Sequence, residues 1–259
     1  MNKTPLCEHA SVLGTQLSLC DQASLLTIIE NAVKSGGQLT ILSGNIHSFN
    51  LAYKTPWLQR FFNQADIVRL DGAGLSLGAR ILGYRTPLRM TWADFGWALA
   101  GMAAEHNFSL YLLGSKAGIA EKAAVALQEK HPNLLIAGTH HGYFDKTPGS
   151  EENKAVLEKI AQSKPDILIV GFGMPLQEQW LSQVRGSLAA NVVMTGGAVF
   201  DYISGELVRA PAWMTNNGLE WLGRMLIEPR RLWKRYIIGN PLFFWRLFIT
   251  QLGFKKPSN

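Results

Sequence analysis

Asp71 is the residue of this chain whose type and position best suit acid–base chemistry. It follows the apolar stretch 67–70 and precedes the glycine-rich residues 72–74. A carboxylate at the end of a strand can remove the proton of a substrate hydroxyl as a general base. Aspartate also caps many helices, and residues 73–81 are expected to form one. The residue types alone leave both roles open.

Residues 169–180, IVGFGMPLQEQW, have the pattern of a ligand-binding turn. An apolar strand is expected to run into Gly171 and Gly173, and the helix that follows opens with Gln177 and Glu178. Glycines let a ligand approach the backbone closely. Two adjacent polar side chains directly after a glycine turn are seldom core residues. We therefore predict that Gln177 and Glu178 face the ligand.

Small and polar residues follow the other predicted strands as well. Ligands of parallel sheets bind at the carboxyl ends of the strands, so six such ends predict one continuous crevice for a large ligand with phosphates. The further residues expected to line it are Ser43, Asn45, Gly114, Ser115, Gly142, Tyr143, Gly197 and Asp201. For Ser43 and Asn45 ordinary turn chemistry is an equally good interpretation, and for Asp201 a cap or local turn remains an alternative.

The sequence lacks the ligands that usually neutralise a diphosphate through a metal ion. It contains no Asp-x-Asp pair, and His47, His140 and His141 have no suitably spaced carboxylate or cysteine partner, so we expect no metal and no cofactor. Helix N-termini and arginine forks can bind phosphate instead. The arginines expected to do so are Arg209, Arg224, Arg231 and Arg235. A solvated helix face or contact with lipid headgroups is the alternative for them.

The elements that must position these residues alternate along the chain. Apolar runs predict strands at 39–42, 67–70, 110–113, 134–137, 167–170 and 192–194. Amphipathic stretches predict helices at 21–33, 73–81, 92–105, 117–130 and 151–161. Strands that alternate with helices predict an α/β fold, Rossmann-like, with a mostly parallel sheet covered by helices on both faces.

Composition agrees with one large α/β domain that carries an appendage. The chain has 259 residues, of which 47% are hydrophobic, enough for a sizeable core. Its two cysteines, Cys7 and Cys20, belong to no Cys/His cluster, so we expect neither a structural zinc nor a disulfide framework, as in a reducing cytoplasm. We see no secretion signal in the first residues.

The last fifth of the chain differs from the rest. Residues 209–259 contain nine Lys and Arg against two Glu, a balance of +7, together with nine aromatic residues. Residues 211–236 predict one or two amphipathic helices interrupted at Pro229, and a second helix opens at Asn240-Pro241. That helix has too short an apolar run to span a bilayer, so we expect it to lie at the surface of an anionic membrane. We divide the chain into a catalytic domain, residues 1–207, and a helical appendage, residues 208–259.

These motifs, taken in order, resemble the WecG/TagA/CpsF glycosyltransferases, bacterial enzymes that build surface polysaccharides on a lipid carrier. The matching residues are Asn45, 71–74, 112–114, 142–144, 165–166, 171–175, 177–178, 196–201, Gly205, 209–211, 218–221, Arg224 and 228–231. Ser43 stands where members often carry Thr, and Trp92 replaces a small residue of a Thr-Gly turn.

The resemblance implies an inverting, metal-independent transfer from a UDP-sugar to a polyprenyl-diphosphate-linked saccharide. It implies that Asp71 is the base, that Arg89 and Gln177 contact the donor, and that the C-terminal arginines reach the acceptor's diphosphate. It also implies a peripheral position on the cytoplasmic face of the cell membrane. N-acetylmannosamine, its uronic acid and glucose remain alternative donor sugars, and a homo-oligomer is left open.

Two other classes of protein compete with this interpretation. A dinucleotide-dependent oxidoreductase would carry Gly-x-Gly-x-x-Gly in its first strand–helix turn, and this chain does not. A nucleic-acid-binding protein could use the basic, aromatic C-terminal segment. Its aromatic residues are spaced for an apolar helix face rather than for base stacking, so we expect no nucleic-acid partner.

Overall fold

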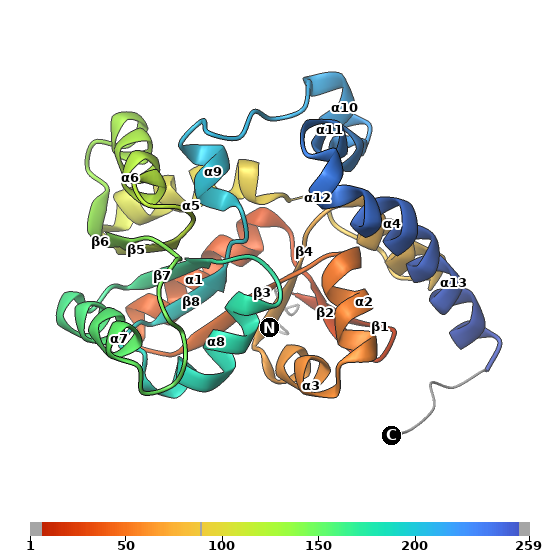
Figure 1. The fold of residues 1–259 in the computed structure, drawn as a ribbon, viewed down its shortest axis with the longest axis horizontal. Helices are drawn as coiled ribbons and strands as arrows, with labels where there is room; N and C mark the ends of the chain where they lie inside the picture. The colour runs from red at the N-terminus through yellow and green to blue at the C-terminus, as the bar shows by residue number, and fades with distance from the viewer. Residues whose placement is uncertain (1–6, 89, 254–259) are drawn as a thin grey trace, which may run out of the picture.

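One eight-stranded sheet organises the chain, with strand order β1-β2-β4-β3-β8-β7-β5-β6 (Figure 1). The structure is a computed structural model that describes residues 7–88 and 90–253. The strands are β1 (Glu8–Val12), β2 (Thr15–Leu19), β3 (Leu39–Gly44), β4 (Ile67–Leu70), β5 (Ser109–Gly114), β6 (Leu135–His140), β7 (Ile167–Gly171) and β8 (Val192–Thr195). Only β1 pairs antiparallel, with β2, and all other pairings are parallel. The predicted α/β class with a mostly parallel sheet is confirmed.

Helices cover both faces of this sheet. Alternate residues of each central strand enter two different cores, as Leu42 and Ile41 of β3 do. One core is covered by α1 (Gln22–Lys34), α5 (Trp92–His106), α6 (Ile119–Lys130) and α9 (Val199–Ile203). The other is covered by α2 (Ile46–Lys54), α3 (Pro56–Gln64), α4 (Ala73–Ile81), α7 (Glu151–Ser163), α8 (Leu176–Val184) and α13 (Gly239–Gln251), while the short turn η1 (Arg185–Ser187) follows α8.

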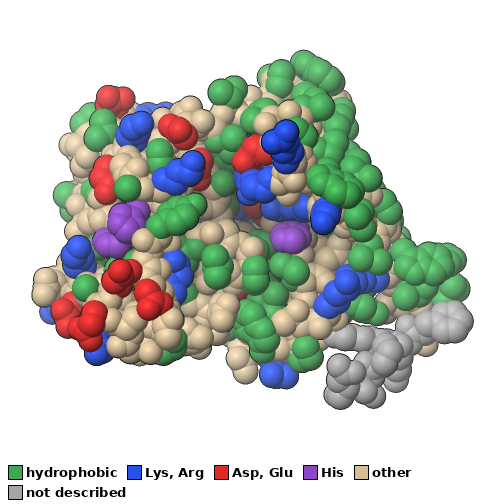
Figure 2. Space-filling model, in the orientation of Figure 1, with side chains coloured by type: hydrophobic (Ala, Val, Ile, Leu, Met, Phe, Trp, Pro, Cys, Tyr) green, Lys and Arg blue, Asp and Glu red, His purple; other side chains and the backbone are tan. Residues whose placement is uncertain are grey.

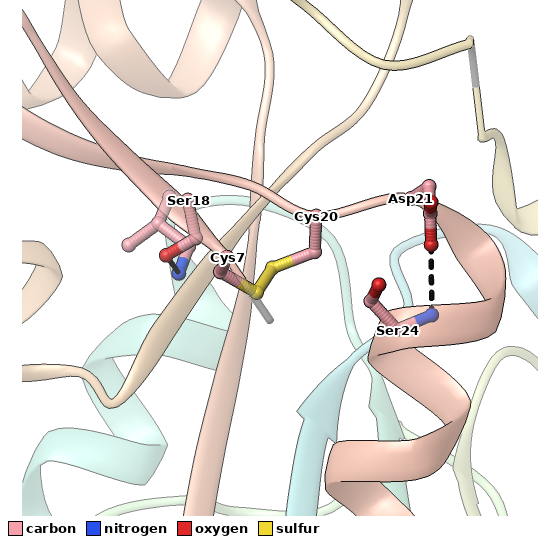
Figure 3. The surroundings of a disulfide bond; sticks show 6 residues. Cys7, Ser18, Cys20, Asp21 and Ser24 are labelled. Atoms are coloured by element: carbon pink, nitrogen blue, oxygen red, sulfur yellow. Dashed lines mark hydrogen bonds between the residues drawn. A yellow bond between two sulfur atoms is a disulfide. The ribbon is translucent and has the colours of Figure 1, made fainter. Parts of the chain in front are cut away.

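The first hairpin overturns one expectation. Leu13 and Gly14 both have positive φ, 53° and 76°, and form the tight turn that pairs β1 with β2. Cys7 and Cys20 flank the paired residues at the open end of this hairpin and form a disulfide (Figure 3). The prediction that no disulfide forms is therefore wrong, because the hairpin was not predicted, and the cysteines give no argument for a reducing compartment.

The C-terminal helices follow the predicted pattern only in part. α10 (Ala212–Asn216) and α11 (Glu220–Ile227) precede α12 (Pro229–Trp233), which Pro229 opens at its first position. The chain then continues through a π-helical turn, η2 (Lys234–Ile238), directly into α13. The predicted new start at Asn240-Pro241 is wrong, since the helix is already formed there.

The last helix, α13, packs against α2 and α4. Its Phe243 and Leu247 are buried in the core, and the Phe243 ring lies so close to Gly78 of α4 that a Cβ there would be 2.6 Å away. Arg246 is buried as well, donates to the backbone oxygen and Oδ1 of Asn50 at 3.1 and 2.7 Å, and lies over the Tyr53 ring. The division at residues 207 and 208 stays a prediction. No helix within the described residues is long and apolar enough to cross a membrane.

Candidate active site

Asp71 lies where β4 ends, and its backbone N–H donates to the Gly44 oxygen at 2.8 Å. The cap residue of α4 is Gly72, with φ of 92°, and no side chain caps this helix. The alternative role of Asp71 as an N-cap is therefore not seen. The carboxylate is about a fifth exposed (21%) and Oδ2 lies 3.5 Å from Nη2 of Arg69. It is thus placed to act on a molecule outside the sheet.

Burial and charges act against each other on this carboxylate. Burial raises the pKa of Asp71 above its ordinary value, and Glu220 adds to the rise. The charge of Arg69 opposes it, followed by those of Arg235 and Arg224. A carboxylate with a raised pKa is a better proton acceptor than one with the ordinary pKa of an exposed aspartate.

The structure brings two predicted arginines to Asp71. Arg224 comes from α11 and Arg235 from η2, and both lie near enough to oppose the rise in the Asp71 pKa. Their Nε atoms are buried and have no hydrogen-bond partner within the described residues. Figure 2 shows Lys and Arg side chains around a hollow below α11 and α12, with a His on its rim. Buried N–H donors of a cation suit phosphate oxygens.

The other two predicted arginines are held by carboxylates. Arg209 binds Asp94 with both ends of its fork, at 2.6 and 2.7 Å, and its Nε lies 3.3 Å from Glu220. Arg231 pairs with Glu228 and is more than half exposed (59%). Its charge still lowers the pKa of Arg235, so it borders the same cluster. Arg209 is the least available of the four for an anionic ligand.

Two residues of the site were not predicted as ligand contacts. His47 lies in the first turn of α2, and burial together with the charge of Arg235 lowers its pKa to about 4. It is a neutral imidazole at pH 7. The Tyr202 ring lies 5.4 Å from the Arg224 guanidinium, and burial raises its pKa to about 12. The sequence did offer a signal for His47, which follows Asn45 by two residues at the same strand end.

Glycines pack the ends of β5, β7 and β8 against one another. A Cβ on Gly114, which has φ of 156°, would meet the Gly171 oxygen at 2.4 Å, and a Cβ on Gly171 would meet the Gly197 oxygen at 2.9 Å. Ser115 donates to Oδ2 of Asp201 at 2.8 Å, and the Gly142 N–H donates to the Ser115 oxygen. The predicted strand-end residues thus do come together at one edge of the sheet.

Gln177 and Glu178 correct the prediction made for them. Both are fully buried and do not face the crevice. The Gln177 Oε1 accepts from the N–H groups of Gly173 and Gly197, at 3.3 and 3.1 Å, and Nε2 donates to Glu178 Oε1 at 2.8 Å. Burial raises the pKa of Glu178 to about 7. The turn pattern predicted the positions of these residues in the chain but not the direction of their side chains, which join the loops at Gly173 and Gly197.

The remaining predicted contacts lie in different surroundings. Ser43 is buried, and its hydroxyl donates to the Thr195 oxygen at 2.7 Å. Asn45 caps α2 by accepting from the Ser48 N–H, so the turn chemistry left open for it is present. Tyr143 is largely exposed (72%). Arg89 lies outside the described residues.

The histidines show no arrangement for a metal. His140 Nδ1 lies 2.8 Å from the backbone oxygen of His141, its neighbour in the chain. Within the described parts of the chain, no three His, Cys, Asp or Glu side chains converge where an ion could be held.

Comparisons with known protein sequences cover most of the chain. The sequence model of the glycosyl transferase WecG/TagA/CpsF family matches residues 10–257. The N-acetylglucosaminyldiphosphoundecaprenol N-acetyl-beta-D-mannosaminyltransferase of Staphylococcus aureus strain NCTC 8325 / PS 47 is 28% identical over 241 residues, which cover 91% of this chain and 92% of the relative. The protein of the same description from strain MW2 is 27% identical over the same span. The chain therefore belongs to the WecG/TagA/CpsF family and is a glycosyltransferase.

Proposed function

We propose that this enzyme transfers N-acetylmannosamine from its UDP-sugar to N-acetylglucosamine carried on a polyprenyl diphosphate. The names of the Staphylococcus aureus relatives describe this acceptor and this transferred sugar. The observation that carries the proposal is the Asp71 carboxylate near Arg224 and Arg235. Their buried Nε atoms have no hydrogen-bond partner within the described residues, although the Nε of Arg224 lies 3.9 Å from Glu228. A base next to cations suits a reaction between a sugar hydroxyl and a donor with a diphosphate leaving group.

The reaction follows from that arrangement. A sugar hydroxyl is a poor nucleophile near neutral pH, so Asp71 takes its proton while the oxygen attacks the anomeric carbon of the donor. The bond from that carbon to the diphosphate breaks on the opposite face, and UDP leaves with the electron pair. One carbon–oxygen bond forms as another breaks, and the configuration inverts. The β-linkage in the relatives' names is the product expected from an α-linked donor.

The developing charge on the leaving diphosphate needs stabilisation. Arg224 and Arg235 supply fixed cations in a partly water-excluded site, where such donors stabilise a transition state most effectively. The neutral imidazole of His47 can donate or accept a hydrogen bond beside Arg235 without adding charge. We assign no step to a metal ion.

The proposed acceptor is a lipid, so the proposed reaction takes place at a membrane surface. Figure 2 shows hydrophobic side chains along α10, α11 and α13, and the large exposed ones on the C-terminal helices are Trp213, Leu226, Ile227, Trp233, Ile237, Ile238, Trp245, Phe248 and Leu252. Exposed apolar area of this kind, next to Lys and Arg, binds the interface of anionic lipids. We propose a peripheral position on the cytoplasmic face of the membrane, with residues 208–259 as the contact.

A donor screen tests the proposed reaction. The enzyme is incubated with a short-chain lipid diphosphate of N-acetylglucosamine and, in turn, the UDP derivatives of N-acetylmannosamine, its uronic acid, N-acetylglucosamine and glucose. We expect one product, from UDP-N-acetylmannosamine, with a β-linkage by NMR and formed equally well with EDTA. Turnover with another donor alone would refute the sugar assignment, and loss of turnover with EDTA would refute the metal-independent reaction.

A further inference from the structure

Arg69 is a charged side chain inside the sheet, which is an expensive place for a charge. It belongs to β4, is only 1% exposed, and precedes Asp71 by two residues. Asp71 follows the end of this strand, and its Oδ2 lies 3.5 Å from Nη2 of Arg69. Removing a guanidinium from water costs several kcal/mol, on the order estimated for buried ions in general, unless partners compensate.

Two atoms of the guanidinium have neutral partners. Nε donates to the Ser43 hydroxyl at 3.2 Å, and Nη1 donates to the Met90 oxygen at 2.9 Å. The group also lies over the rings of Trp92 and Phe95, 4.7 and 5.4 Å from their centroids. These contacts connect β4 to β3 and to the start of α5.

Trp92, which replaces a small residue of the family's turn, belongs to this cluster rather than to the crevice. It is 5% exposed, and its Nε1 lies 2.9 Å both from the Ser43 hydroxyl and from the Thr195 oxygen. Ser43 and Trp92 thus both contact Arg69 as well as each other.

The third nitrogen of Arg69 has a different neighbour. Nη2 is buried and has no hydrogen-bond partner within the described residues, and the Oδ2 atom of Asp71 lies 3.5 Å from it. A movement of a few tenths of an ångström would turn this ion pair into a charge-assisted hydrogen bond. The neutral contacts of Nε and Nη1 could be made by an uncharged donor, so the charge itself is explained by Asp71.

We propose that Arg69 is a positioning residue for the transfer reaction: through Nη2 it fixes the direction of the Asp71 carboxylate and keeps it ionised when bound substrates exclude water. This rests on the proposed role of Asp71 as the base. The other groups whose charges act on Asp71 are Glu220, Arg224 and Arg235. All three come from α11 and η2, so Arg69 is the cation that acts from the sheet side.

The pH dependence of kcat/KM tests this role. In Arg69→Met, which fills similar volume without charge, we expect the acid limb to move up by about 1 pH unit or more, the effect typical of losing an opposite charge near a carboxylate. Trp92→Phe is the matched control: it removes the indole N–H from the same cluster and leaves the charge, so its acid limb should stay in place. Thermal unfolding and UDP binding by calorimetry check that each variant is folded.

The outcomes separate the possible failures. A folded Arg69→Met enzyme whose acid limb coincides with that of the wild type overturns the inference. If Arg69→Met does not fold, Arg69→Lys tests the inference instead. Lysine keeps the charge but lacks the planar guanidinium, so we expect the acid limb to stay in place while kcat falls about tenfold. An unchanged kcat, or an acid limb that moves, would then overturn the inference. Asp71→Asn is assayed alongside, and wild-type turnover in that variant would instead refute the proposed function.

Discussion

Two carboxyl groups follow strands of the same sheet: the partly buried Asp71 comes after β4, and the fully buried Glu178 lies in the first turn of α8, after β7. Burial raises the pKa of both. The Asp71 side chain is about a fifth exposed and has three arginines near it. Glu178 is fully buried, and within the described residues the side chain hydrogen-bonded to it is the amide of Gln177. Burial alone therefore does not identify a base, and the cations and the access to substrate distinguish Asp71.

The difference also assigns a role to Glu178. Its Oε2 has no hydrogen-bond partner within the described residues, while Oε1 holds the Gln177 amide. Gln177 in turn fixes the Gly173 and Gly197 loops. The carboxyl of Glu178 thus supports the two glycine loops through Gln177, and we propose that the carboxyl of Asp71 acts on the substrate.

Replacing Asp71 should have the largest effect. Asp71→Asn keeps the shape but cannot accept the proton, so kcat should fall about 100-fold to 10,000-fold, the range for a lost general base. Donor binding by calorimetry should be nearly unchanged. Glu178→Gln is the matched control and should keep kcat within about tenfold, because Glu178 does not reach the substrate. Equal losses in the two variants would remove the distinction between the carboxyls.

Removing Arg224 or Arg235, the two arginines near Asp71, should have the next largest effect. Arg224→Ala and Arg235→Ala should each lower kcat about 100-fold or more, as for other groups that stabilise a leaving oxyanion. Arg230→Ala, an exposed neighbour on α12, serves as the control and should be nearly neutral. Steady-state kinetics with both substrates varied measures this, and equal losses in all three would mean that the effect is one of net charge.

Releasing the Gly173 and Gly197 loops from Gln177 should weaken binding of the UDP-sugar donor. Gln177→Ala leaves two loop N–H groups and a carboxyl without their partner, which we expect to cost about 1–3 kcal/mol of stability. The KM for the UDP-sugar should rise about tenfold, a cost of about 1.4 kcal/mol in binding. Gln179→Ala changes an exposed neighbour and is the control. A normal donor KM in Gln177→Ala would show that these loops do not depend on Gln177.

The titration of Glu178 should appear in stability rather than in turnover. Its pKa is raised from 4.5 to about 7, so the folded state holds a proton between these values that the unfolded chain has lost. The unfolding free energy must then fall as pH rises through that range, and this loss is absent in Glu178→Gln. Between pH 4.5 and 7, the free energy of unfolding of Glu178→Gln should rise by about 3 kcal/mol relative to that of the wild type. Urea unfolding at several pH values tests this, and a constant difference would contradict it.

The sequence predicts the sheet well because its central strands are continuous apolar runs, as at 167–170, buried on both faces. It misses the first hairpin, where polar residues alternate with apolar ones and the strands are only five residues long. It also locates Asp71 correctly, since glycines mark the strand end. The sequence motifs did not indicate a role for Arg69, because those motifs lie at strand ends. An arginine inside a buried strand is nevertheless a signal of function.

Side-chain direction is what the sequence could not supply. Gln177 and Glu178 follow the right turn, but a helix begins there with either face toward the loops, and the packing of Trp180 against Phe172 and Phe144 turns them inward. Arg209 and Arg235 are of the same type in the same segment. Only the fold shows that Arg209 binds Asp94, whereas the Nε of Arg235 has no hydrogen-bond partner in the part of the chain that the structure describes.

The pH profile of kcat/KM in single-turnover assays tests the central claim most directly. If Asp71 is the base, the acid limb seen in the wild type should disappear in Asp71→Asn, whose residual rate then rises with hydroxide concentration, and it should persist in Glu178→Gln. The opposite result, a limb that survives in Asp71→Asn and is lost in Glu178→Gln, would place the base at the other carboxyl and contradict this account.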